Sequence, residues 1–197
     1  GVMSLIREYQ RNILKSGAEC TIDFDELIDF VLLAEEVEGF DENTTLVEIR
    51  PVVPSRLVEC LGSYHTYLAD RGITESTAQK WNLGWDIVDD RVLFPIYDLE
   101  NGEDVVVGIT GRTIIGEEPK WKNYPSKLKK SQYLFGEHMI RDGRQCVIIV
   151  EGPIDVVVVS QALEEYGMAA EFGCVGLMGS KASVEQRNKL ISYGTEI

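Results

Sequence analysis

The sequence has few of the features that mark secreted, membrane or zinc-stabilised proteins. Its four cysteines lie far apart and form no C-x-x-C pair, which argues against a zinc site within the chain and favours reduced thiols. No apolar run is long enough to cross a bilayer, and the N-terminus lacks a basic segment followed by an apolar stretch. We therefore expect a cytoplasmic protein that has no membrane partner.

Positive charge is also scarce. Lysine and arginine total 19 against 33 acidic residues, giving a formal net charge of −14, and taken alone this argues against binding to nucleic acid. The distribution of charge indicates otherwise, since acids crowd the first fifty residues and lysines gather in one later stretch. That stretch, residues 120–130, is a candidate surface for nucleic acid. Its lysines are Lys120, Lys122, Lys127, Lys129 and Lys130.

The most informative stretch, residues 145–160, reads Q-C-V-I-I-V-E-G-P-I-D-V-V-V-V-S. Residues 147–150 are apolar and mostly β-branched, which predicts a strand buried on both faces in a parallel sheet. Gly152 and Pro153 predict a turn that opens a helix. Glu151 would then follow the strand directly, with Asp155 in the first helical turn, so both carboxylates would lie at the edge where α/β sheets bind ligands.

Carboxylates in this position suit Mg²⁺ (or Mn²⁺), which prefers oxygen ligands and is often shared with phosphates. Glu151 and Asp155 are therefore the candidate catalytic and metal-binding residues. The structural alternative is that Glu151 only ends a strand and Asp155 only complements a helix N-terminus.

These residues also carry a family resemblance. V-I-I-V-E-G-P-I-D-V-V-V resembles the first motif of the Toprim domain, which is shared by DnaG-type primases, type IA and II topoisomerases and some nucleases. Residues 172–186 resemble the second strand of a primase Toprim domain, with its glycine-rich exit and following helix. We expect Gly176 and Gly179 there to let the backbone approach a ligand.

The stretch before this motif narrows the resemblance to primases. Residues 91–97 and 105–115 are predicted strands, and Asn101-Gly102 between them is a strong hairpin signal. The order R-V-x-F-P-I-x-D, V-x-G-x-x-G-R, K-W-x-N-x-P and K-x-x-x-L-F-G resembles the basic subdomain that precedes Toprim in DnaG-type primases. The sequence departs from the usual pattern at Trp121 and Tyr124, which replace tyrosine and serine, and in a shortened loop before Lys130.

The resemblance implies that Arg112, Lys120, Asn123 and Lys130 hold the single-stranded template and incoming nucleotides. The residues themselves suit this role, since lysine and arginine bind phosphates and tryptophan can stack on a base. An exposed loop with solvated lysines is the alternative. The candidate nucleic-acid and nucleotide ligands are Arg112, Lys120, Trp121, Asn123, Lys127 and Lys130.

The remaining pattern predicts helices over residues 2–15, 23–37, 55–71 and 74–81, with a connector over 38–54. The run Y-L-A-D-R-G, residues 67–72, resembles the start of the primase core and is interpreted as packing. A helix from 153 to about 167, a strand over 173–178 and a helix capped by Ser183 and Gln186 complete the chain. We expect an α/β protein with an acidic helical segment (1–54), an α+β basic subdomain (55–144) and a partial Toprim parallel sheet (145–197).

The resemblance implies a Mg²⁺-dependent primase that makes short RNA primers on single-stranded DNA from ribonucleoside triphosphates. It would work with a fused or separate replicative helicase in a primosome, in the bacterial host cytoplasm if it is phage-encoded. Zinc would be present only if a zinc ribbon precedes residue 1. The second acidic motif of Toprim proteins, D-x-D, would follow Ile197, so we expect this fragment to be inactive alone. Alternatives are another Toprim enzyme (a nuclease or topoisomerase-like protein) and a non-catalytic single-strand-binding or assembly module.

Overall fold

The computed structural model describes residues 53–100, 102–140 and 146–193. All of them lie in the second of the chain's two units, Arg50–Ile197. The helices predicted over residues 2–15 and 23–37 and most of the connector lie outside the described residues. The three-part domain division likewise stays a prediction.

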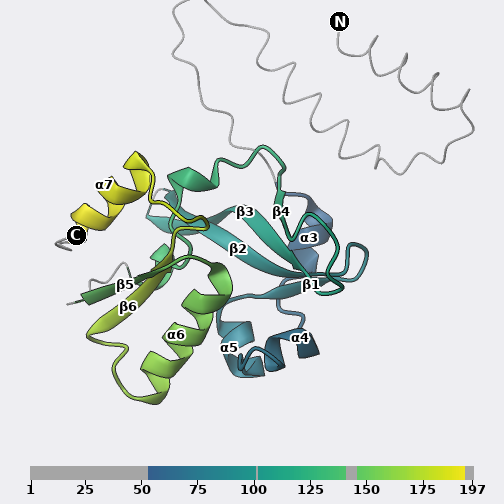
Figure 1. Cartoon of the computed structure of the whole chain (residues 1–197), viewed down its shortest axis with the longest axis horizontal. Helices are drawn as coiled ribbons and strands as arrows, with labels where there is room; N and C mark the ends of the chain where they lie inside the picture. The colour runs from purple at the N-terminus through teal and green to yellow at the C-terminus, as the bar shows by residue number, and fades with distance from the viewer. Residues whose placement is uncertain (1–52, 101, 141–145, 194–197) are drawn as a thin grey trace, which may run out of the picture. The chain divides into compact units, whose positions relative to one another are not determined.

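A four-stranded antiparallel sheet forms the first half of the described chain (Figure 1). Strands β2 and β3 are joined by the predicted tight turn, because Glu100 pairs with Glu103 and Gly102 has a φ of 85°. The hairpin predicted from Asn101-Gly102 is therefore confirmed. In order across the sheet, the strands are β1 (Gly84–Asp86), β2 (Arg91–Glu100), β3 (Glu103–Thr113) and β4 (Trp121–Tyr124).

Both faces of this sheet are covered, because consecutive side chains of β2 point to opposite faces and residues 91–96 are all buried. Phe94 belongs to the larger core, together with Trp81, Phe135 and Val156. Leu93 precedes Phe94, and its side chain points to the other face of the sheet. It belongs to a smaller core there with Leu57, Ile109 and Tyr124. The larger core joins the antiparallel sheet to the second half of the chain.

The segment before the sheet differs from the single long helix predicted over residues 55–71. It forms α3 (Ser55–Glu59) and α4 (Thr66–Ala69), and the prediction of one continuous helix is wrong. Between them Leu61 makes a β-bridge with Gly84, and Gly62 takes a φ of 86°, which breaks the helix. The next helix, α5 (Glu75–Lys80), begins as predicted at Thr74, whose side chain accepts a hydrogen bond from the Thr77 N–H.

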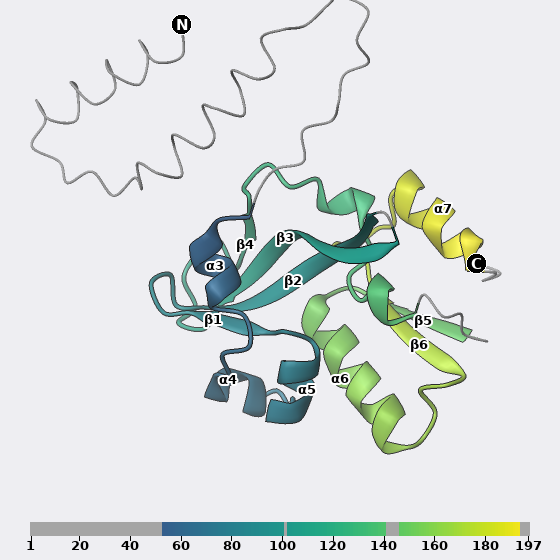
Figure 2. The same ribbon diagram turned by 180° about the vertical axis from the view of Figure 1, so that it is seen from behind.

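The second half contains two parallel strands, β5 (Cys146–Val150) and β6 (Phe172–Gly176), connected by α6 (Pro153–Glu165) (Figure 2). Helix α7 (Val184–Ser192) begins at the predicted capping box of Ser183 and Gln186, which is confirmed. Phe135 forms an antiparallel bridge with Gly176 on the other side of β6. Strand β6 therefore has a neighbour on each side.

Strand β5 is not buried on both faces in the described structure, contrary to the prediction. Val147 is 8% exposed, but Ile149 is 39% exposed. Among the described residues, β5 pairs with β6 alone, so it is an edge strand there. The combination of helices, a parallel pair and an antiparallel sheet confirms the predicted α/β class. Within the described chain, no helix has the length and apolar character needed to cross a bilayer.

Helix α6 is fastened to the turn between α4 and α5 by one glutamine, and the two segments lie side by side in both views (Figures 1 and 2). Gln161 accepts a hydrogen bond from the Thr74 N–H and donates one to the Gly72 carbonyl, each 2.9 Å long. Lys80 and Glu164 form an ion pair beside them. This contact fixes α6 relative to the residues just before Gly72.

We expect Gln161→Ala to lower the free energy of unfolding by about 1–2 kcal/mol, because it removes two hydrogen bonds to backbone groups. Gln161→Glu should have an intermediate effect, since the carboxylate still accepts from Thr74 but cannot donate to Gly72. Urea denaturation followed by circular dichroism measures both. Equal stability of all three proteins would show that this contact contributes nothing.

Candidate functional site

The two predicted carboxylates lie where β5 passes into α6. Glu151 follows the last residue of β5, Gly152 is the N-cap of α6, and Asp155 lies in its first turn. Val156 and Val157 are fully buried and anchor this turn, whereas Glu151 and Asp155 are both exposed. The strand, the turn and the helix start thus present two acids to solvent on a rigid base.

Both acids line one cleft of about 460 Å³ that also takes in the antiparallel sheet. Four of the six predicted nucleic-acid ligands line the same cleft, namely Arg112, Lys120, Trp121 and Lys130. They come from β3, from the start of β4 and from the short 3-10 helix η1 (Lys130–Gln132). The chain therefore brings acids and bases that are about 20 to 40 residues apart in sequence to one concave surface.

Arg112 and Trp121 are direct partners in the β3–β4 ladder. The Arg112 guanidinium carbon lies 5.4 Å from the centre of the Trp121 ring, and Phe94 packs 5.6 Å from the same ring. These contacts hold the arginine by a cation–π interaction. Its buried Nε atom has no hydrogen-bond partner among the described residues, so a donor remains for a ligand.

Asn123 and Lys127 do not line the cleft. Asn123 lies beside it on β4, paired with Thr110, which does line it. Lys127 is exposed in the segment between β4 and η1. Their proposed contacts with nucleic acid stay predictions.

The described lysines of this stretch do not all face the cleft. Lys122 points away from the cleft and pairs with Asp89 at 2.5 Å, and the Tyr124 hydroxyl donates to the same carboxylate at 2.6 Å. The hydrogen bonds from Lys122 and Tyr124 hold the pKa of Asp89 below its ordinary value. Lys122 is thus committed to a structural ion pair, whereas Lys120 and Lys130 face the cleft.

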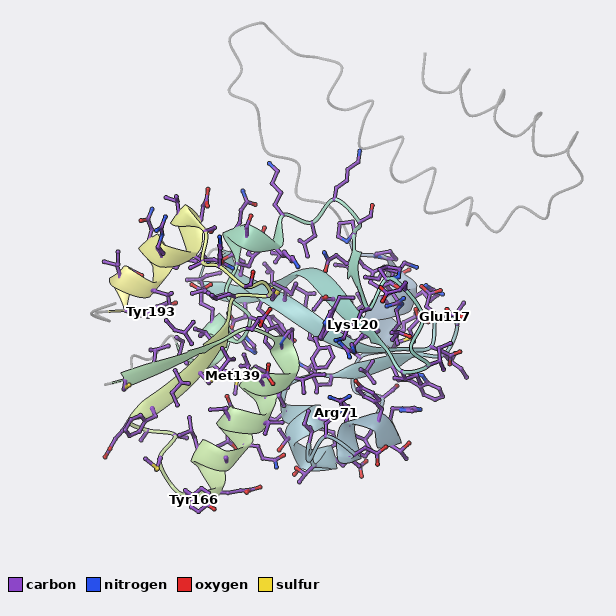
Figure 3. The ribbon with its side chains drawn as sticks, viewed as in Figure 1. Arg71, Glu117, Lys120, Met139, Tyr166 and Tyr193 are labelled. Carbon is purple, nitrogen blue, oxygen red and sulfur yellow. The ribbon has the colours of Figure 1, made fainter. Side chains whose placement is uncertain are left out.

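Sequence reasoning missed Arg71, which was interpreted as part of a packing segment. Arg71 lines the cleft, with its guanidinium carbon 5.0 Å from the centre of the Tyr67 ring. Figure 3 labels Arg71 on the helical segment that precedes the sheet, and Lys120 on the loop that leads into β4. Met178, with a φ of 54°, and Gly179 complete the lining after β6. An arginine followed directly by a turn glycine was the available signal for Arg71.

Gly176, the last residue of β6, and Gly179 were expected to let the backbone approach a ligand, and for Gly176 this is wrong. A Cβ atom at Gly176 would lie 2.9 Å from Val156 Cγ2, so its missing side chain makes room for α6. A Cβ at Gly179 would have no atom within 4 Å. Gly179 remains open to the cleft that it lines.

The cleft contains two of the carboxylate ligands that a Mg²⁺ ion would need. Glu151 and Asp155 offer the oxygen atoms that Mg²⁺ prefers, but no group of three His, Cys, Asp or Glu side chains able to hold an ion occurs among residues 53–100, 102–140 and 146–193. Burial, with a smaller contribution from the charge of Asp155, raises the pKa of the Cys174 thiol to about 12. Cys174 is therefore a neutral thiol within the larger core.

The chain is similar in sequence to curated proteins named DNA primase. A DNA primase of Synechococcus elongatus is 35% identical over 114 residues, which cover 55% of this chain and 15% of that protein. A DNA primase of Clostridium acetobutylicum is 26% identical over 143 residues, 67% of this chain and 22% of that protein. No family model matches the chain.

Solved structures agree in fold. The catalytic domain of a DnaG primase bound to single-stranded DNA matches with a TM-score of 0.50 at 21% identity, over 65% of this chain and 52% of that one. The chain is similar to DnaG-type DNA primases. A structure of the DnaG catalytic core matches equally well, with a TM-score of 0.50 at 23% identity over 65% of this chain and 51% of that one. These matches confirm the resemblance to DnaG-type primases, although the chain spans less than a quarter of the two curated primases above and about half of the solved DnaG chains.

Gly176 and Gly179 provide a matched test of the packing between α6 and β6. We expect Gly176→Ala to lower the free energy of unfolding by about 1–3 kcal/mol, because the new methyl group overlaps Val156. Gly179→Ala should change stability by less than about 0.5 kcal/mol, because open space surrounds that position. Thermal and urea unfolding measure both, and equal losses would contradict the proposed close approach of α6 to β6.

Proposed function

We propose that this chain forms part of the catalytic core of a DNA primase, which makes short RNA primers on a single-stranded DNA template. One observation carries the proposal: a single cleft contains two carboxylates at a sheet edge together with Arg112, Lys120, Lys130 and Trp121. Acids suit metal-assisted phosphoryl chemistry, and the cations and the aromatic ring suit a nucleic-acid strand. The relatives named DNA primase support the same reading.

In this proposal β5, α6 and β6 are part of a Toprim domain. Glu151 accepts the proton of the attacking 3′-hydroxyl. The 3′ oxygen then bonds to the α-phosphorus of a ribonucleoside triphosphate, and pyrophosphate leaves. Asp155 supports Glu151 from the first turn of α6. Arg71, Arg112, Lys120 and Lys130 hold phosphates, and Trp121 contributes a surface for a base.

The proposed metal is Mg²⁺ or Mn²⁺, with Glu151 and Asp155 as its protein ligands. The ion would supply charge neutralisation for the transferring phosphate. Two exposed carboxylates fit such an ion but bind it weakly without further ligands. The proposal therefore includes further acidic ligands besides these two. Single-stranded DNA, ribonucleoside triphosphates and a replicative helicase are the proposed partners.

A second candidate is a non-catalytic module that only binds single-stranded nucleic acid. The incomplete metal-ligand set among the described residues favours it. Binding to single strands would then be sensitive to salt but indifferent to Mg²⁺ and to the loss of Glu151.

Glu151→Gln separates these candidates when introduced into the natural protein that contains this chain. We expect primer synthesis to fall at least 100-fold, since the neutral amide can neither accept the proton nor balance the positive charge of the metal ion. Binding to single-stranded DNA should stay within about two-fold. Glu165→Gln, at the exposed far end of α6, is the control and should synthesise normally. Undiminished synthesis by Glu151→Gln would remove this residue from the mechanism.

One lysine inside the cleft and one outside it give a second test, on the 197-residue chain itself. We expect Lys130→Ala to weaken binding to single-stranded DNA several-fold and to reduce the slope of log K against log salt by about 0.7, because one phosphate contact is lost. Lys122→Ala should change neither, because Lys122 is paired with Asp89 outside the cleft. Fluorescence anisotropy at several salt concentrations measures both. Equal effects of the two substitutions would mean that binding follows total charge.

A further inference from the structure

Lys130 lies at the start of η1, a segment that has little hydrophobic burial to hold it in place. None of the three residues of η1 is buried, and Lys130 and Ser131 are exposed. A 3-10 turn of this length also has poor hydrogen-bond geometry of its own. The position of Lys130 at the cleft therefore depends on polar contacts with the backbone around it.

Two of those contacts come from the first turn of α7. The Ser183 hydroxyl donates a hydrogen bond to the Ser131 carbonyl at 2.6 Å. The side-chain amide nitrogen of Gln186 donates to the Tyr133 carbonyl at 2.8 Å. Both acceptors are main-chain atoms, so these bonds fix the backbone that directly follows Lys130.

The capping box of α7 does not require these two bonds. The box uses the Ser183 hydroxyl oxygen, which accepts from the Gln186 N–H, and the Gln186 side-chain oxygen, which accepts from the Ser183 N–H. Ser183→Asp and Gln186→Glu would both keep these accepting oxygens. Only a hydroxyl at position 183 and an amide at position 186 can also donate to η1, so the two side chains have a second task besides capping.

Gln186 also reaches the opposite wall of the cleft. Its amide nitrogen donates to the Leu177 carbonyl at 2.8 Å as well as to Tyr133. Met178 and Gly179, which follow Leu177, line the same cleft as Lys130. Gln186 is only 1% exposed, so this amide is an interior group that joins two separate segments beneath the cleft lining.

We propose that Ser183 and Gln186 are positioning residues, which hold Lys130 at the cleft by anchoring the backbone of η1 to the first turn of α7. Neither residue lines the cleft, so each acts through Lys130. The consequence for nucleic acid rests on the proposed function, in which Lys130 contacts a strand, whereas the anchoring of η1 does not.

Substitutions at Ser183 separate anchoring from capping, whereas Gln186 is too deeply buried to be replaced without destabilising the fold. Ser183→Thr keeps the acceptor and the donor, Ser183→Asp keeps only the acceptor, and Ser183→Ala keeps neither. Ser192→Ala is the control, because the Ser192 hydroxyl donates to the Lys189 carbonyl within α7.

Hydrogen exchange of the 197-residue chain, followed by mass spectrometry, measures the anchoring without any ligand. We expect residues 130–134 to exchange about five-fold faster in Ser183→Asp and Ser183→Ala, because one hydrogen bond contributes about that factor to the opening equilibrium. Ser183→Thr and Ser192→Ala should exchange like the parent. Unchanged exchange in Ser183→Asp would overturn the proposal.

Binding to an oligothymidylate, measured by fluorescence anisotropy at several salt concentrations, tests the consequence for Lys130. We expect Ser183→Asp to weaken binding several-fold and to reduce the slope of log K against log salt, as Lys130→Ala does. In a chain that already carries Lys130→Ala, Ser183→Asp should have no further effect, because both changes remove the same contact. A loss of stability alone would not produce this coupling.

An equal effect of Ser183→Asp in the presence and absence of Lys130 would overturn the positioning role, since the new carboxylate would then repel the strand directly. Failure of the proposed function gives a different result. Faster exchange of residues 130–134, in a chain whose binding Lys130→Ala leaves unchanged, would keep the anchoring of η1 and refute the strand contact of Lys130.

Discussion

The cleft depends on one packing contact, the burial of the first turns of α6 against the antiparallel sheet. Val156 and Val157 are fully buried in the same core as Trp81, Phe94 and Phe135. Because this core lies between the two sheets, it sets the distance from the acids at the start of α6 to the cations on β3 and β4. Burial of two valines stabilises this arrangement by several kcal/mol, more than any exposed ion pair in the cleft could.

The same contact places the two candidate catalytic acids directly beside the hydrophobic core. Within residues 151–157 the exposed acids are one or two positions away from fully buried side chains. On the opposite side, Gly136 has a φ of 84°, and a Cβ there would lie 2.9 Å from Val156 Cγ1 and 3.2 Å from the Trp81 ring. Close packing of this kind transmits small shifts, so a core substitution here would move Asp155 as well as destabilise the fold.

Features set by neighbours in sequence were predictable, and features set by distant partners were not. The Asn101-Gly102 hairpin, the Thr74 cap and the Ser183 capping box depend on a few adjacent residues, and each was predicted. The break after α3 depends on the Leu61–Gly84 bridge, and the need for glycine at position 176 depends on Val156. Arg71 was missed for the same reason, because Gln161, far along the chain, holds the turn that follows it.

The acidity of the chain does not oppose a nucleic-acid cleft once distance is considered. Around the cleft, four cations (Arg71, Arg112, Lys120 and Lys130) face two acids (Glu151 and Asp155), although the whole chain carries a net charge of −14. At physiological salt the Debye length is about 8 Å, so exposed acids farther away than this are largely screened. Contact affinity therefore follows the local excess of positive charge, while the distant acids act mainly at low salt, where they slow the approach of a strand.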